Sequence, residues 1–281
     1  KMKRKKIIKG KEEQKSTPIS TSISTPNPTF ESKVFEIPIE DFDKDMETDS
    51  AKEKKKEILE LFTTYNKLCS KEEYDEIKYD LHNLCRKGNI ELIQIILSET
   101  IENDSKSLKF KINDSNQTAS LFKINKDIKH VIIPRTVEHK SKSYLITSIC
   151  HTSDSIEIIE FSDDSAVETI YENAFSRSKI DSISIPSKVS KICECAFYDC
   201  YRLEKVEILT NSNIQTIERH AFSRSKIKSF IIPSKLSKLN EYVFYECECL
   251  RKIEIPTNSN LQTIESNAFS KSKVEEINFP A

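Results

Sequence analysis

The C-terminal two-thirds of the chain repeats one short apolar pattern seven times, and this periodicity constrains the fold more than any other feature. In each copy, two residues separate a first apolar position from a second, and one residue separates the second from a third. The copies start 28, 24, 23, 24, 23 and 24 residues apart, at Ile128, Ile156, Ile180, Leu203, Ile227, Leu250 and Val274. A period of ~20–29 residues predicts a solenoid of stacked turns rather than a closed globule.

A row of phenylalanines repeats in the same part of the chain and supports this prediction. Its members lie 22, 25, 22 and 25 residues apart, at Phe175, Phe197, Phe222, Phe244 and Phe269. Short and long turns therefore alternate, and residues 174–220 and 221–267 are identical at 30 of 47 positions. One turn alone has no core, so the apolar faces are expected to cover one another when turns stack at ~4.8 Å.

Alternation along each strand predicts which residues face solvent. The last two apolar residues of a copy, such as Val131 and Ile133, are expected to point inward, and the residue between them outward. Extended strand faces are the usual binding surface of solenoids, and exposed apolar residues suit contact anchors. The candidate partner-binding residues on this face are Ile132, Ile158, Glu160, Lys205, Glu207, Lys228, Ile231, Arg251, Lys252 and Glu254. The alternative is that the charged members merely solvate the sheet.

The whole chain of 281 residues is interpreted as an α+β repeat protein in three parts. Residues 1–50 join a lysine-rich cluster to a Ser/Thr/Pro tract and predict a disordered tail. Residues 51–104 carry apolar residues three and four apart and predict a small helical module. Residues 105–281 predict a leucine-rich-repeat solenoid with about seven short parallel strands. A hairpin of strands at 108–112 and 119–124 is expected to cap it, with a small insertion at 137–144.

Part of the expected helical module, residues 81–97, resembles an ankyrin repeat. The resemblance rests on the pair Leu81 and His82, on Gly88 and on the apolar run that follows. The segment lacks the Thr-Pro that precedes the Leu-His pair in that family. A lone repeat cannot bury its faces, so the preceding helix is expected to cover it.

The solenoid resembles the BspA-like (Treponema-type) leucine-rich repeat family. The strand-ending Ile-Pro pairs at 133–134, 185–186, 232–233 and 255–256 carry this resemblance, as do the Ile-x-x-x-Ala-Phe turns and the equivalent Cys200 and Cys247. It implies adhesion and protein binding without enzymatic activity. The Gly that the family often places before Ala-Phe is missing here. Its region holds Cys193, Glu218, Asn240 and Glu265, which leaves the geometry of these corners open.

Composition and spacing argue against catalysis, cofactors and metals. The chain has only two glycines, too few for a phosphate-binding loop, and a net charge of -1, which disfavours a specific nucleic-acid binder. It has no run of ~18 apolar residues that would span a membrane. Cys200 and Cys247 lie two turns apart, ~9.6 Å and beyond the ~7 Å reach of a disulfide, so both are predicted to be buried thiols. No zinc-ligand spacing and no nucleophile motif accompanies them.

These observations predict a non-enzymatic, surface antigen-like adhesion protein that contacts a protein or other macromolecular ligand through its strand face. No small-molecule substrate and no cofactor is expected. The alternative is an intracellular scaffold that combines ankyrin-like and leucine-rich repeats, so a cell-surface and a cytoplasmic location both stay open. Glycan on Asn103, Asn113 or Asn116 would exclude the intracellular alternative. A start at Lys1 and an end just after a strand-like run favour a fragment of a longer protein.

Overall fold

The computed structural model describes residues 53, 56–58, 60, 95, 99–102 and 107–279. The expected tail, and the ankyrin-like stretch apart from Ile95, lie outside the described residues. The described residues between 53 and 95 are helical, but strand β1 (Glu99–Glu102) occupies the end of the expected helical module. The structure differs from the prediction here because the backbone of β1 pairs antiparallel with β2 (Leu108–Asn113).

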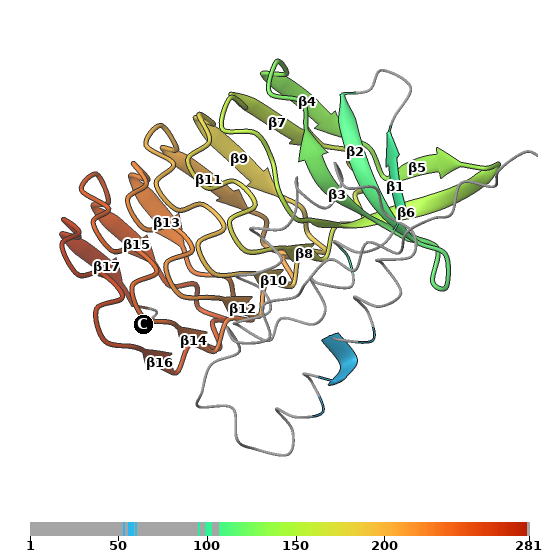
Figure 1. The fold of residues 1–281 in the computed structure, drawn as a ribbon. Coiled ribbons are helices and arrows are strands. Elements are labelled where there is room, and N and C mark those ends of the chain that lie inside the picture. The colour runs from blue at the N-terminus through green and yellow to red at the C-terminus, as the bar shows by residue number, and fades with distance from the viewer. Residues whose placement is uncertain are drawn as a thin grey trace, which may run out of the picture. The chain divides into compact units, whose positions relative to one another are not determined.

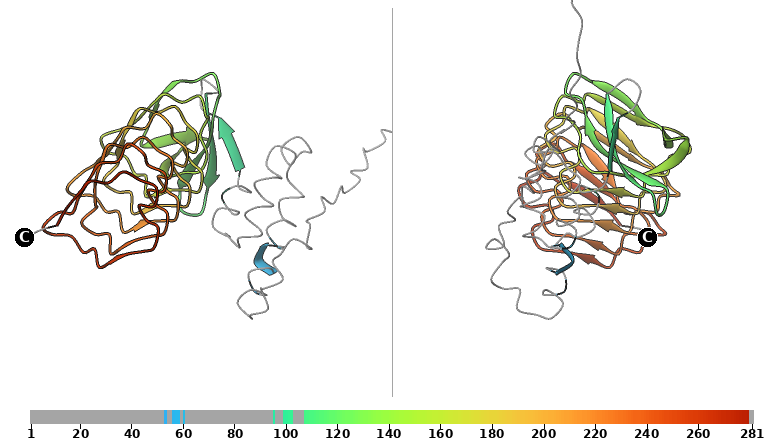
Figure 2. Two further views of the ribbon diagram at one scale, coloured as in Figure 1. Left: turned by 90° about the vertical axis from the view of Figure 1, so that its left-hand side faces the viewer. Right: turned by 45° about the vertical axis from the view of Figure 1, so that its right-hand side comes forward.

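Seven short strands form one side of the solenoid, and they confirm the prediction drawn from the repeat (Figure 1). Figure 2 shows the turns that carry them stacked along one direction. The strands of this row are β4 (His130–Ile133), β7 (Ile158–Phe161), β9 (Ser182–Ile185), β11 (Lys205–Ile208), β13 (Ser229–Ile231), β15 (Lys252–Glu254) and β17 (Glu276–Asn278).

A second row of two-residue strands runs along another side of the turns and was not predicted from the sequence. Its members are β8 (Thr169–Ile170), β10 (Lys191–Ile192), β12 (Thr216–Ile217), β14 (Lys238–Leu239) and β16 (Thr263–Ile264). They are the Ile or Leu at the start of the Ile-x-x-x-Ala-Phe turns, each with the residue before it. The neighbours β8, β10 and β12 pair in parallel, as do β14 and β16.

The hairpin predicted at the start of the solenoid is present. Strand β2 pairs antiparallel with β3 (Thr118–Ile124), and β3 then pairs in parallel with β6 (Lys142–Ile149). The expected insertion is a second hairpin, in which β5 (Thr136–His139) pairs antiparallel with β6. Because β6 also pairs with β8, the cap and the first three strands of the second row form one sheet with the order β1-β2-β3-β6-β8-β10-β12, while β14 and β16 form a separate sheet.

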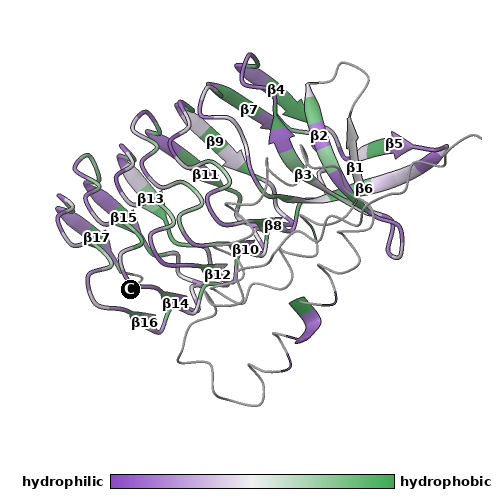
Figure 3. Cartoon of the chain, viewed as in Figure 1, coloured by the Kyte–Doolittle hydropathy of each residue, from purple (hydrophilic) through white to green (hydrophobic). Residues whose placement is uncertain are grey.

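The core is the continuous interior of these turns. Val131 and Ile133 are buried and Ile132 is exposed, as alternation predicts, and apolar and polar colours alternate along this row in Figure 3. The phenylalanine row forms a stack through the interior, with ring centroids 5.1 to 5.7 Å apart. Each fully buried large side chain contributes ~1.5–3 kcal/mol, so this interior is the main source of stability.

At their corners, the turns contain non-glycine residues in the left-handed backbone conformation that glycine adopts most easily. In each of the five turns that carry the phenylalanine row, two positions have φ between 55° and 62°. One lies directly before the Ala-Phe or Val-Phe pair, and the other lies four residues later. They are Asn173, Arg177, Cys195, Asp199, His220, Arg224, Tyr242, Glu246, Asn267 and Lys271. The last of these, with φ 58°, belongs to the turn of Phe269, which is only partly buried. A left-handed non-glycine residue costs ~1–2 kcal/mol, which the packing of the turns must offset.

The predicted cysteine ladder is also confirmed. Cys200 and Cys247 are fully buried, and all six described cysteines are free. Cys200 Sγ donates to the carbonyl of Phe175 at 3.0 Å and lies 3.4 Å from Ser178 Oγ. Cys247 repeats this arrangement one super-period later, with Phe222 and Ser225 as its partners. Burial raises the pKa of Cys200 to about 12 and that of Cys247 to about 11.

Candidate functional site

The candidate site is the outward face of the row β4 to β17, called the strand face below. The parallel registers place His130 beside Ile158 and Ile132 beside Glu160 on β4 and β7. The same two outward positions recur on each later strand. Eight of the ten predicted residues therefore lie within these strands, and Lys228 and Arg251 directly precede β13 and β15. The structure brings the predicted residues to one face.

Large apolar side chains interrupt this polar face. Ile132, Ile158 and Ile231 are 57%, 49% and 47% exposed. Leu209, which the sequence analysis missed, is 47% exposed directly after β11. A sequence signal for it exists, because Leu209 stands where five of the six other copies of the repeat have a Pro after the strand. Isolated exposed apolar residues are common, so only their arrangement around a hollow gives them meaning.

Most basic groups of the strand face are already paired with carboxylates. Lys228 hydrogen-bonds Glu204, which raises the pKa of the lysine, and Lys252 does the same with Glu254 at 2.7 Å. Arg251 lies 3.1 Å from a carboxylate oxygen of Glu275 on the neighbouring turn. Exposed pairs of this kind contribute little to stability, so their main effect here is to neutralise the basic end of the face.

A groove of about 630 Å³ crosses the strand face over β7, β9 and β11. Its middle strand presents only two small outward residues, Ser182 and Ser184, while longer side chains stand on both neighbours. The hollow thus follows from the side-chain sizes on three successive strands. The groove contains four of the ten predicted residues, Ile158, Glu160, Lys205 and Glu207. The others lie on the strand face outside it.

The groove is acidic. Five carboxylates and one lysine line it, which gives a net charge of −4. These residues are Glu157, Glu160, Asp163, Asp181, Glu207 and Lys205. Part of this charge is offset by neighbours, because Lys129 contacts Glu157 at 3.3 Å and Arg202 contacts Asp181 at 2.7 Å. Within the described residues Asp163 has no ion-pair partner. The apolar side chains of Ile158 and Leu209 stand among these carboxylates.

The described residues contain neither a metal-ligand cluster nor a membrane-spanning helix. Among them, no group of three or more His, Cys, Asp or Glu side chains could hold a metal ion. In the same part of the chain, no helix combines the length and apolar character needed to cross a bilayer.

Comparison with known families gives a match for the later turns. Residues 168–281 match the BspA type leucine rich repeat region in six copies. The resemblance drawn from the sequence is thereby confirmed for these residues, and the ankyrin-like resemblance is not supported. No curated protein matches the chain.

Several solved bacterial structures are similar in fold. The Treponema pallidum leucine rich repeat protein TpLRR shares 18% identity over 64% of this chain and 72% of its own, with a TM-score of 0.45. The pneumococcal vaccine antigen PcpA shares 16% identity over 65% and 70%, with a TM-score of 0.38. A leucine rich cell surface protein of Faecalibacterium prausnitzii A2-165 shares 21% identity over 57% of this chain, with a TM-score of 0.34. The chain spans 55% of the length of that protein.

Proposed function

We propose that this chain is a non-enzymatic protein-binding module whose strand face contacts a macromolecular partner. The observation that carries the proposal is the acidic groove over β7, β9 and β11, with two serines as its floor and exposed apolar side chains at Ile158 and Leu209. An extended peptide segment with basic and apolar side chains complements this surface in charge and in hydrophobicity.

The dimensions of the groove favour an extended segment over a helix. Three adjacent strands at ~4.8 Å spacing offer a width of about 10 Å. A helix with its side chains is ~10–12 Å across and would contact only the rims, whereas an extended chain can reach the serine floor. Removal of water from the apolar rims and neutralisation of the carboxylates would then supply the affinity.

We further propose an adhesion-type, surface antigen-like role, which rests on the resemblance of the repeats to the BspA-like family. An intracellular scaffold is the second candidate. Two predicted glycan acceptors, Asn113 and Asn116, are exposed at the turn between β2 and β3, so they are accessible to modification. Glycan on either residue in the native host would support the surface role, and a host that glycosylates other proteins but leaves both bare would favour the scaffold.

The chain provides a matched pair of variants for testing the groove. Ser182 and Ser229 occupy equivalent outward positions 47 residues apart, opposite Lys205 and Lys252 respectively. Only Ser182 lies in the groove. Ser182→Trp fills the groove with a large side chain, and Ser229→Trp adds the same side chain elsewhere on the strand face.

The probe is a fluorescent seven-residue peptide of alternating lysine and leucine, with a glutamate-leucine peptide of the same length as its control. We expect the basic peptide to bind the full chain, and Ser182→Trp to weaken binding about tenfold or more, as loss of a central contact does. Ser229→Trp should bind as the unmodified chain does. Equal binding to both variants, or equal binding of the acidic peptide, would refute the proposed site. Matching melting temperatures would verify that both variants fold.

A further inference from the structure

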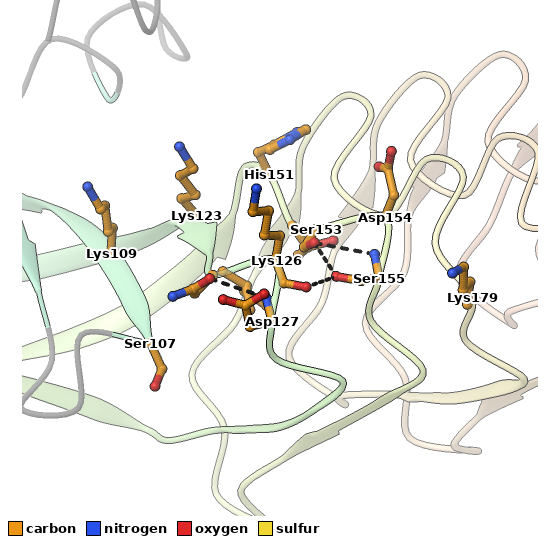
Figure 4. Close-up of a pocket in the computed structure, with 13 residues that line it drawn as sticks. Ser107, Lys109, Lys123, Lys126, Asp127, His151, Ser153, Asp154, Ser155 and Lys179 are labelled. Atoms are coloured by element: carbon orange, nitrogen blue, oxygen red, sulfur yellow. Dashed lines mark hydrogen bonds between the residues drawn. The ribbon is translucent and has the colours of Figure 1, made fainter. Parts of the chain in front are cut away.

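A second cavity lies away from the strand-face groove, beside the capping hairpin. It measures about 800 Å³ and contains none of the ten residues predicted to bind a partner (Figure 4). Its walls come from β2, from β3 and the loop that follows it, and from the loop at residues 151–155. Lys179, shortly before β9, closes the far side. This cavity is called the basic cleft below.

The basic cleft concentrates positive charge. Its four lysines, Lys109, Lys123, Lys126 and Lys179, face only two carboxylates, so the net charge is +2 with His151 neutral. The whole chain carries a net charge of -1, so positive charge is more concentrated in the cleft than in the protein as a whole. In Figure 4 the side chains of Lys109, Lys123 and Lys126 extend in the same direction from neighbouring backbone segments.

The lysines come from three different parts of the chain, and two of them have no carboxylate partner among the described residues. Lys109 on β2 stands directly opposite Lys123 on β3 in the antiparallel register, which brings their two side chains to one place on the sheet. Within the described residues Lys126 and Lys179 have no ion-pair partner. Lysines of the strand face, such as Lys228 and Lys252, do have carboxylate partners. A bound anion would supply Lys126 and Lys179 with the counter-charge that they lack among the described residues.

The walls of the cleft are already fixed by hydrogen bonds. The amide of Asn125 donates to the carbonyl of Ser107 at 2.9 Å, which ties the loop after β3 to the start of β2. Ser155 Oγ donates to the carbonyl of Lys126 and lies 2.7 Å from Ser153 Oγ, which joins the two loops. A preformed cavity loses less entropy on binding than one that must be assembled.

We propose that the basic cleft binds a compact polyol that carries two or more phosphate or sulfate groups. The lysine ammonium groups supply point charges suited to such oxyanions. The carboxylates of Asp127 and Asp154, which also line the cleft, can accept hydrogen bonds from the hydroxyl groups of the same ligand. The volume is within the range of small-molecule sites, ~300–1,000 Å³. This site is independent of the proposed partner-binding groove.

The test is isothermal titration calorimetry of the full chain at low salt with inositol hexakisphosphate and with sucrose octasulfate. Uncharged inositol and sucrose are the matched controls. Binding of only one polyanion would identify the source as a phosphate or a sulfate ester, and binding of both would support the shared oxyanion chemistry. Failure of both to bind would overturn the proposal, as would tighter binding of a single-stranded oligonucleotide than of either probe.

The double variant Lys126→Gln/Lys179→Gln removes the two lysines that lack ion-pair partners within the described residues. We expect it to bind the polyanion about tenfold more weakly or worse, because it removes two charge-assisted contacts to the oxyanions. Lys188→Gln/Lys273→Gln removes the same charge from exposed positions outside the cleft and should leave affinity unchanged. Equal affinity of the two double variants would overturn the proposal. Circular dichroism of both checks that the fold is intact.

Discussion

Phe197 and Phe222, 25 residues apart in the chain, stack with ring centroids 5.1 Å apart and an angle of 6° between their planes. Both rings are fully buried, and each also stacks on the equivalent ring of its other neighbouring turn. Each turn that carries a phenylalanine therefore contributes one ring, and that ring is covered only when the neighbouring turns have folded against it. Stability in this fold is a property of adjacent pairs of turns.

Phe222→Ala should destabilise the solenoid strongly. The variant leaves a cavity in the middle of the ring stack and removes contacts with Phe197 and Phe244. We expect a loss of about 3–5 kcal/mol in the free energy of unfolding, measured by urea denaturation. Phe279→Ala, at a residue that is 69% exposed, provides the comparison and should change stability little. Equal losses for the two variants would contradict the ring stack as the source of stability.

The two cysteines of the buried ladder should be protected from chemical modification. At pH 8, iodoacetamide is expected to label the partly exposed Cys195 and Cys249 in the folded protein, and to label Cys200 and Cys247 only after unfolding. Mass spectrometry of the peptides measures this order. Rapid labelling of Cys200 in the folded protein would be incompatible with its burial.

The same two thiols should make stability depend on pH in the alkaline range. Their pKa values rise on folding from 9.0 to about 12 and about 11, so the unfolded chain loses their protons first. Their contribution is complete below pH 9 and is lost as the pH rises toward 11 to 12. Cys200→Ser/Cys247→Ser should reduce this loss, because serine occupies the same slot at Ser178 and Ser225. An unchanged alkaline slope in the variant would disprove the linkage.

A glycine at one of the strained corners should stabilise the protein. Arg177 has a φ of 61° and its side chain is exposed, with Asp199 3.9 Å away as its ion-pair partner. Arg177→Gly relieves ~1–2 kcal/mol of left-handed strain but increases the entropy of the unfolded chain, so the expected net gain is ~0.5–1 kcal/mol.

The neighbouring variant Ser176→Gly serves as the control for Arg177→Gly. Residue 176 is not among the positive-φ positions, so glycine there only adds freedom to the unfolded chain and should lower stability slightly. Thermal melting of both variants measures the difference. A stabilising Ser176→Gly, or a destabilising Arg177→Gly, would show that strain at the corner is not the deciding factor.

The sequence predicted the strand face more completely than the rest of the fold. A seven-fold pattern with apolar side chains at fixed offsets determines which residues face inward, so Val131, Ile132 and Ile133 were placed correctly. The second row escaped prediction because strands of two residues, such as Thr169–Ile170, are too short for any periodicity. Strand β1 was missed because the apolar spacing in residues 90–97 favoured a helix, and the predicted helical module was extended to residue 104 across the four residues that pair with β2.

Both cavities were beyond prediction for a related reason. Alternation predicts that Ser184, between Ile183 and Ile185, faces outward, but the groove arises from the small size of Ser182 and Ser184 relative to the side chains on two other strands. The basic cleft joins Lys109, Lys126 and Lys179, which are 17 and 53 residues apart in the chain. Periodicity reports the inside and outside of a turn, whereas a cavity depends on which turns and loops become neighbours.

The 47-residue super-period has a consequence for how such a chain can change its length in evolution. Short and long turns alternate, and so do the serine and cysteine slots in the buried ladder. Gain or loss of a single turn would place two turns of one kind side by side and mismatch their contacts. Duplication or deletion of two turns together would preserve every junction. Recombination between the similar segments 174–220 and 221–267, which are identical at 30 of 47 positions, would make such a change in one step.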